Sequence, residues 1–139
     1  MGLDVYLFRI ADDGCDDVDE CERVDLPSTL YPDHDFRIGY FRSRYGRGGM
    51  DRVLKHHAGT DMSRIMGRNY DDTVSHPDWA SSIRRAKDAH QLLAISAMGS
   101  PQSMKELLWY MQAITIMIET CEWVMRQPDP ERYALHWSS

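Results

Sequence analysis

The sequence predicts an α+β fold in which a small antiparallel sheet packs on a long antiparallel helical hairpin. Apolar residues alternate in two short segments of the first half, and they recur every three or four positions through the second half. At 139 residues, of which 42% are apolar and 27% charged, the chain has the size of a single domain. We expect strands, an acidic loop and an Arg/Gly-rich loop in residues 1–68, the helical hairpin in 75–127, and a docking tail in 128–139.

Two segments have the pattern of half-buried strands. In residues 3–10, Leu3, Val5 and Leu7 occupy alternate positions, and the segment is rich in residues that favour β-structure. Residues 35–43 alternate in the same way, with Ile38 on one face of the expected strand. We therefore expect these two segments to be adjacent strands of the sheet.

The charges of the first half are separated along the chain. Residues 11–35 hold ten carboxylates against the single cation Arg23, a net charge of −9, whereas residues 36–68 hold eight cations against two carboxylates, a net charge of +6. The whole chain has a net charge of −6, which disfavours broad contact with a long nucleic acid. A confined basic site for a small anion remains compatible with this charge distribution.

The acidic stretch between the two strands is too polar to pack. We expect residues 11–25 to form a solvated loop. Its carboxylates lack the alternating order and the closing Glu of an EF-hand, so no Ca²⁺ site is predicted. Farther along, Leu26-Pro27-Ser28 and Tyr31-Pro32-Asp33 predict turns.

The most unusual segment, residues 36–52, combines five arginines with four glycines and three interleaved aromatic residues. A strand, a glycine-rich turn and a short helix in this order can present backbone N–H groups to an anion. Arginine adds paired donors that match phosphate or carboxylate. The glycines fit neither the Walker loop nor the dinucleotide-binding GxGxxG spacing. The arginines and glycines are Arg37, Arg42, Arg44, Arg47, Arg52, Gly39, Gly46, Gly48 and Gly49, and the aromatic residues are Tyr40, Phe41 and Tyr45.

This segment predicts a site for a small anionic, phosphate-bearing ligand such as a nucleotide. Arg42, Arg44 and Arg47 would contact the anion, while Tyr40 or Tyr45 would stack on a ring of the ligand. The alternative is that the arginines pair with the acidic loop or with Asp51. The complete set of candidate ligand-binding residues is Tyr40, Arg42, Arg44, Tyr45, Arg47, Gly48, Gly49 and Arg52.

Two short helical segments are expected after the glycine-rich turn. Residues 50–57 have an apolar face, and Gly59 follows as a stop signal. Thr60 is placed to cap a further turn over residues 61–66, which Gly67 ends.

The helical hairpin has clear start and stop signals. Ser75-His76-Pro77-Asp78 predicts a helix start, and Gly99 ends that helix. Ser100-Pro101 opens the next helix at once, so the two helices should be antiparallel. The second helix should run from about Pro101 to Arg126, where Gln127-Pro128 ends it.

The second helix is apolar on nearly every face, which usually means burial on more than one side. For a small domain this predicts a homo-oligomer through residues 101–126, with Trp109 and Tyr110 as contact anchors. A different hypothesis follows from the same surface: the chain is a protein-interaction or inhibitor module that acts through the acidic loop or this apolar helix.

Enzymatic activity is left open, with a non-enzymatic protein favoured. A small phosphodiesterase or nuclease would have to use Asp51, His56 and His57, but Asp51 and His56 do not share a helical face, and neighbouring histidines diverge by about a hundred degrees. The sequence contains no HExxH motif. We therefore assign no catalytic residue, no metal ligand and no cofactor.

The composition favours a cytoplasmic protein that is not inserted in a membrane. No apolar run reaches the roughly 18 residues of a transmembrane helix, and the N-terminus does not resemble a secretory signal. The three cysteines form no CxxC pair, so a disulfide framework is not expected.

Parts of the sequence resemble a group of small uncharacterised phage and bacterial proteins that begin MGLDxYL and carry a later GYxR element. The matching residues are the opening segment MGLDVYL and the GYFR element that begins at Gly39, with Pro77-Asp78-Trp79 as a weaker third element. The resemblance covers the first strand and the Arg/Gly-rich segment. It implies an accessory or counter-defence role and brings no established activity with it.

Overall fold

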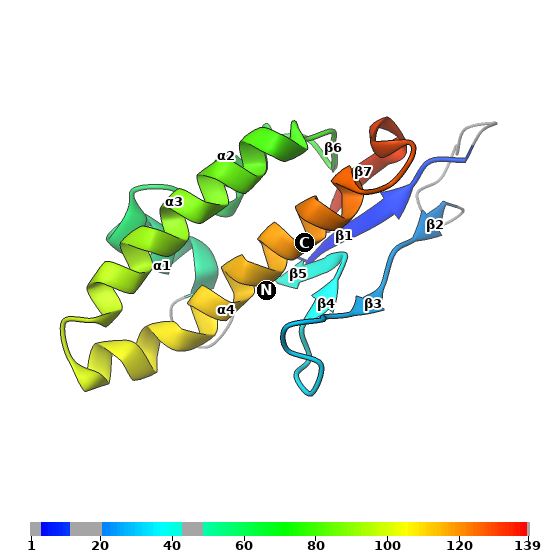
Figure 1. The fold of residues 1–139 in the computed structure, drawn as a ribbon. Coiled ribbons are helices and arrows are strands. Elements are labelled where there is room, and N and C mark those ends of the chain that lie inside the picture. Colours follow the sequence, from blue (N-terminus) through cyan, green and yellow to red (C-terminus); the bar gives the residue numbers. More distant parts are fainter. Residues whose placement is uncertain (1–3, 12–20, 43–48, 139) are drawn as a thin grey trace.

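A computed structural model describes residues 4–11, 21–42 and 49–138, and it has the predicted α+β architecture. An antiparallel sheet lies beside a hairpin of two long helices, α3 (Trp79–Ala97) and α4 (Pro101–Met125), as Figure 1 shows. The helix α4 packs against α3 and against the sheet strands β4 (Arg37–Ile38) and β5 (Tyr40–Arg42). Its broad apolar surface is thus largely used within the chain itself.

The sheet is centred on β1 (Asp4–Arg9) and β7 (Tyr133–Ser138), which pair over their full length from Asp4↔Ser138 to Arg9↔Tyr133. The strand order is β3-β4-β5-β1-β7-β6, and β2 (Glu22–Arg23) also pairs with β1. The outer strands are β3 (Leu26–Pro27) and β6 (Val74–Ser75). The tail that was expected to dock on the body therefore forms a central strand, preceded by a short 3-10 helix at Pro130–Arg132.

The predicted neighbourhood of residues 3–10 and 35–43 is confirmed, because β5 pairs with β1 in the register Tyr6↔Tyr40. The prediction of one continuous second strand was wrong. Gly39 has a φ of +96° and separates β4 from β5, and a residue in that conformation cannot continue a regular strand. The predicted turn at residues 26–28 was also wrong in part, since Leu26 pairs with Ile38.

The helix signals gave good boundaries with two corrections. The helix α1 (Gly49–Ala58) and the break at Gly59 agree with the prediction. The cap of α2 (Met62–Ile65) is Asp61 rather than Thr60, since the Asp61 carboxylate accepts from the Arg64 N–H. Asp78 caps α3, and Ser75 lies in β6 instead of the helix start. Ser100 caps α4 as expected for Ser100-Pro101.

One main core lies between the sheet and the helices. Val5, Leu7 and Leu135 from the sheet pack there with Leu93 and Ile114 from the hairpin, and all five are fully buried. A smaller cluster of Phe8, Cys21 and Ala134 forms separately. The last strand contributes Tyr133, Leu135 and Trp137 to the main core and Ala134 to the smaller cluster.

The cysteines differ from expectation at one position. Cys21 is disulfide-bonded, although no disulfide framework was predicted, and Cys121 is a free thiol in the core. None of the helices within the described residues combines the length and the hydropathy that a bilayer span requires.

Candidate ligand-binding site

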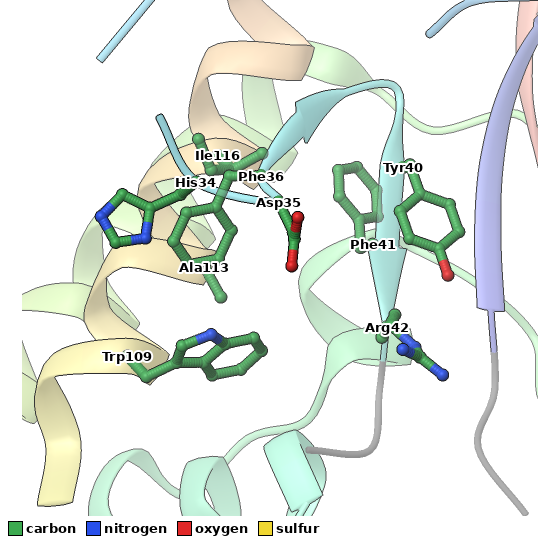
Figure 2. A pocket seen from close by; sticks show the side chains of 9 residues that line it. All are labelled: His34, Asp35, Phe36, Tyr40, Phe41, Arg42, Trp109, Ala113 and Ile116. Atoms are coloured by element: carbon green, nitrogen blue, oxygen red, sulfur yellow. The ribbon is translucent and has the colours of Figure 1, made fainter. Parts of the chain in front are cut away.

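A pocket of about 340 Å³ lies between α4 and the segment that leads into β4 and β5. Its apolar walls come from Trp109, Ala113 and Ile116 on α4 and from Phe36 and Phe41 on the facing segment, as Figure 2 shows. A volume of this size suits a small organic molecule. The pocket is thus a concave, mainly apolar site at the meeting point of helix and sheet.

The aromatic side chains of the pocket support one another. The Phe36 ring lies 5.6 Å from the Trp109 ring between centroids, and Trp109 meets Tyr110 edge-on at 5.3 Å. Behind Phe36, the rings of Tyr31 and His34 each lie 5.7 Å away. Because aromatic pairs at such centroid separations attract one another, these contacts stabilise the wall.

Two charged residues border this apolar surface at different places. In Figure 2 the Asp35 carboxylate lies between the rings of Phe36 and Phe41, inside the mouth of the pocket. Within the described part of the chain it has no hydrogen-bond or ion-pair partner. Arg42 lies at the end of β5, with its side chain 53% exposed and its Nε 3.4 Å from Asp4 Oδ1. The pocket therefore has an acceptor within it and a cation at its rim.

Tyr40 lines the pocket, but its ring points to the other side of β5 from Phe41 (Figure 2). There it packs against Tyr6, with 5.1 Å between the ring centroids and a tilt of 43°, and donates from its hydroxyl to Asp4 at 3.2 Å. Partial burial and then the Asp4 carboxylate raise the pKa of Tyr40, so its hydroxyl stays a donor at neutral pH. Asp4 thus contacts both Tyr40 and Arg42.

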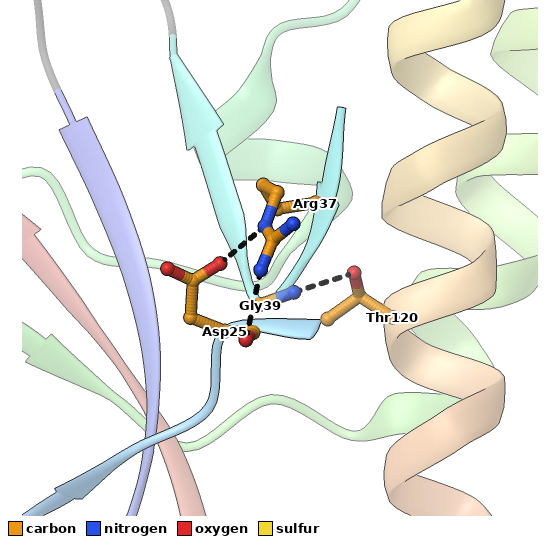
Figure 3. Close-up of polar contacts among 4 residues, drawn as sticks. All are labelled: Asp25, Arg37, Gly39 and Thr120. Carbon is orange, nitrogen blue, oxygen red and sulfur yellow. Dashed lines mark hydrogen bonds and ion pairs between the residues drawn. The ribbon is translucent and has the colours of Figure 1, made fainter. Parts of the chain in front are cut away.

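Polar contacts join the β4–β5 segment to α4 and to the residue that precedes β3. The Gly39 N–H donates to Thr120 Oγ1 at 3.2 Å, and Arg37 binds Asp25 through its Nε at 2.7 Å (Figure 3). A Cβ added to Gly39 would lie 2.2 Å from the backbone oxygen of Val24. Only glycine therefore permits this close approach of the backbone at position 39 to Val24.

A buried carboxylate holds the loop that carries the pocket wall. Glu119 of α4 is 7% exposed and accepts from Ser28 Oγ at 2.9 Å, from the Thr29 N–H at 2.7 Å and from Thr29 Oγ1 at 2.8 Å. Residues 34–36 follow in the same loop. Glu119 is hence a positioning residue for the pocket, and the sequence offered no signal for it.

The structure divides the predicted site residues. Tyr40 and Arg42 line the pocket, whereas Gly49 begins α1 and Arg52 lines a separate, open groove on that helix. Within that groove Arg52 is joined by Lys55. The remaining four candidates lie outside the described residues, as do residues 12–20 of the acidic loop, and they are Arg44, Tyr45, Arg47 and Gly48.

Sequence reasoning missed most of the pocket. Asp35 and Phe36 were assigned only to a strand, and Trp109 was interpreted as an oligomer anchor. These residues meet because β4 and β5 pack on α4, about 70 residues away in sequence. The sequence shows an aromatic residue at position 36 and an apolar helical segment at 101–126, but it does not show that the two are in contact.

The alternative catalytic group on α1 is not assembled. The Asp51 carboxylate accepts from the Met62 N–H at 2.9 Å, at the start of α2. Burial raises the pKa of Asp51, and burial followed by the nearby His56 lowers the pKa of His57. The two histidine rings meet edge-on at 4.6 Å and line the open groove, to which Asp51 does not contribute. In residues 4–11, 21–42 and 49–138 no group of three His, Cys, Asp or Glu side chains could hold a metal ion.

Comparisons with protein-family models, with curated proteins and with solved structures found no match to this chain.

Proposed function

We propose that this protein binds a small phosphate-bearing ligand with a planar ring, of which a nucleotide is the model. The ring would enter the aromatic pocket, and the phosphate would lie at its rim beside Arg42. The observation that supports this proposal is the position of Arg42, the first exposed arginine of the Arg/Gly-rich segment, at the edge of a pocket lined by Phe36, Phe41 and Trp109.

The physical argument combines two contributions. Stacking a ring on aromatic side chains is worth about 1–3 kcal/mol for a nucleobase and tolerates different bases. A guanidinium adds charge-assisted, paired hydrogen bonds to phosphate oxygens. Asp4 competes for Arg42, but the 3.4 Å contact is exposed, and exposed ion pairs contribute only about 0–1 kcal/mol. A phosphate can therefore recruit Arg42 at little cost.

The proposal is tested by isothermal titration calorimetry with single nucleoside monophosphates at low salt. Combined Arg42→Ala and Arg44→Ala substitutions should lower the affinity at least tenfold, because the phosphate loses its counter-charge. Arg84→Ala, at an exposed arginine on α3, is the matched control and should leave the affinity unchanged. Retention of full affinity in the double variant would refute the proposal.

A second candidate is self-association or partner binding through the far end of the helical hairpin. Leu92 and Ile95 of α3, Met98 just after it, and Met104 and Leu108 of α4 are between 39% and 78% exposed. Trp109 and Tyr110 are partly buried against the core, so they are weaker anchors than the sequence implied. Sedimentation velocity tests this candidate. The wild type should sediment as a dimer, and the carboxylate introduced by Leu108→Glu should dissociate it into monomers.

The biological setting follows from the sequence resemblance alone. A phage or bacterial accessory or counter-defence protein could act by sequestering such a ligand without converting it. Native mass spectrometry of gently purified protein tests this role directly, because a sequestering protein should carry a released phosphate-bearing molecule.

A further inference from the structure

We propose that the pocket selects a ring with two adjacent N–H donors, as guanine has, and that the carboxylate of Asp35 accepts both. This inference rests on the proposed nucleotide-binding function and names the class of base. The Asp35 carboxylate lies between Phe36 and Phe41 at the mouth of the pocket, without a partner among the described residues (Figure 2).

The free carboxylate sets the chemistry of the ring. An ionised carboxylate offers acceptors only, and its two oxygens are spaced to receive two parallel N–H bonds. Guanine presents a ring N–H and an exocyclic amino group side by side. Adenine presents an amino group beside an unprotonated ring nitrogen, whose lone pair would face the second carboxylate oxygen. Hypoxanthine keeps the ring N–H and lacks the amino group.

The surroundings of Asp35 make this discrimination effective. The pocket walls beside it are carbon surfaces from Phe36, Phe41 and Trp109, so a bound ring would displace water from the carboxylate. A hydrogen-bonding group that loses water without gaining a donor opposes binding, and this is why polar sites reject analogues more strongly than apolar sites do. Asp35 would thus penalise the wrong base as well as favour the right one.

The separation of charges fixes the orientation of the ligand. Asp35 lies inside the mouth and Arg42 lies at the end of β5, so an acidic and a basic residue border the pocket at different places. A phosphate next to Asp35 would be repelled, whereas one beside Arg42 would be attracted. A molecule with N–H donors at one end and an anion at the other can contact Asp35 and Arg42 at once.

The experiment measures the affinities of GMP, IMP and AMP by calorimetry for the wild type and for Asp35→Asn. We expect GMP to bind at least tenfold more tightly than IMP or AMP, and Asp35→Asn to remove that preference by weakening GMP at least tenfold. Asp33→Asn is the matched control, because Asp33 is an exposed acid of the same loop that does not line the pocket. Circular dichroism confirms that each variant is folded.

The outcomes separate this inference from the proposed function. If the three nucleotides bind equally, or if Asp35→Asn leaves the GMP preference intact, the assignment of Asp35 is overturned. The general binding function then stands provided that Arg42→Ala still weakens all three. If none of them binds at about 1 mM, the nucleotide-binding function and the inference fall together.

Discussion

Glu119 Oε2 accepts a hydrogen bond of 2.9 Å from Ser28 Oγ, across 91 residues of sequence. The same hydroxyl oxygen accepts from the N–H groups of Leu30 and Tyr31, both at 3.1 Å. One buried carboxylate therefore organises the turn that begins the loop, and through the loop it positions the pocket wall at residues 34–36. The helix that supplies one side of the pocket thereby also fixes the other.

We expect Glu119→Ala to lower the free energy of unfolding by about 2–4 kcal/mol, because Ser28 and Thr29 would lose their shared buried acceptor. Urea denaturation measures the change. Glu122→Ala, three residues on in the same helix and half-buried, is the control and should cost about 1 kcal/mol or less. Equal losses in the two variants would show that the Glu119 contacts contribute nothing specific.

Gly39→Ala should be among the most damaging substitutions in the sheet. The new Cβ would lie 2.2 Å from the Val24 oxygen, and the φ of +96° is unfavourable for alanine. We expect a loss of about 3 kcal/mol or more, because the backbone at Gly39 or Val24 would have to move. Thermal unfolding followed by circular dichroism checks this value.

Gly59 provides the matched control for Gly39. Its φ is +64°, also left-handed, yet a Cβ there would meet nothing within 4 Å. Gly59→Ala should therefore cost only the conformational term of about 1–2 kcal/mol. If the two alanine variants lost the same stability, the close approach to Val24 would not be the cause.

The parts of the fold that follow local rules were predictable from the sequence. Helix limits depend on capping and glycine signals within a few residues, and Ser100 and Gly59 give those signals directly. Strand identity depends on pairing. The tail forms a central strand because it pairs with β1 along six residues. No local sequence pattern indicates that pairing.

The site was only half predictable for the same reason. Arg42 and Tyr40 belong to a segment whose composition is unusual, so the sequence pointed to them. Asp35 and Trp109 are ordinary residues in ordinary segments, and they come to line the same pocket only because β5 packs beside α4. The sequence predicted an anion contact, whereas the apolar pocket beside it is a product of tertiary packing.

Asp51 should make the stability of the protein fall as the pH rises above its ordinary pKa of 3.8. Burial, as the largest cause, raises the pKa of Asp51 in the folded chain. The folded state therefore binds this proton more tightly than the unfolded state, and that advantage is lost as the pH rises through the folded pKa. Asp51→Asn, whose amide oxygen can still accept from Met62, should gain stability relative to the wild type over this window. Melting temperatures between pH 4 and pH 7 measure the difference.

Asp78 supplies a control of opposite sign. The hydrogen bond from the Ser81 N–H, as the largest cause, lowers the pKa of Asp78 at the start of α3. Its contribution is present above the ordinary pKa and is lost as the pH falls through the folded pKa. At neutral pH, Asp78→Asn should melt at a lower temperature than the wild type, whereas Asp51→Asn should melt at a higher one. Both differences should shrink as the pH falls. If the melting temperatures of both variants changed with pH in the same way relative to the wild type, the opposite pKa shifts of Asp51 and Asp78 would be contradicted.

The thiol of Cys121 should be inert until the protein unfolds. It is 0% exposed in the core, and burial followed by the neighbouring Glu122 raises the pKa of Cys121 to about 12. At pH 8 about one thiol in ten thousand would be ionised, and the thiolate is the reactive form. We expect iodoacetamide to modify Cys121 only with the same denaturant dependence as global unfolding, as measured by peptide mapping with mass spectrometry. Val124→Ala, which removes buried carbon atoms from the same helix, should shift both labelling and unfolding to lower denaturant together. Rapid labelling of Cys121 in the native wild type would instead mean that this part of α4 opens independently of the rest of the core.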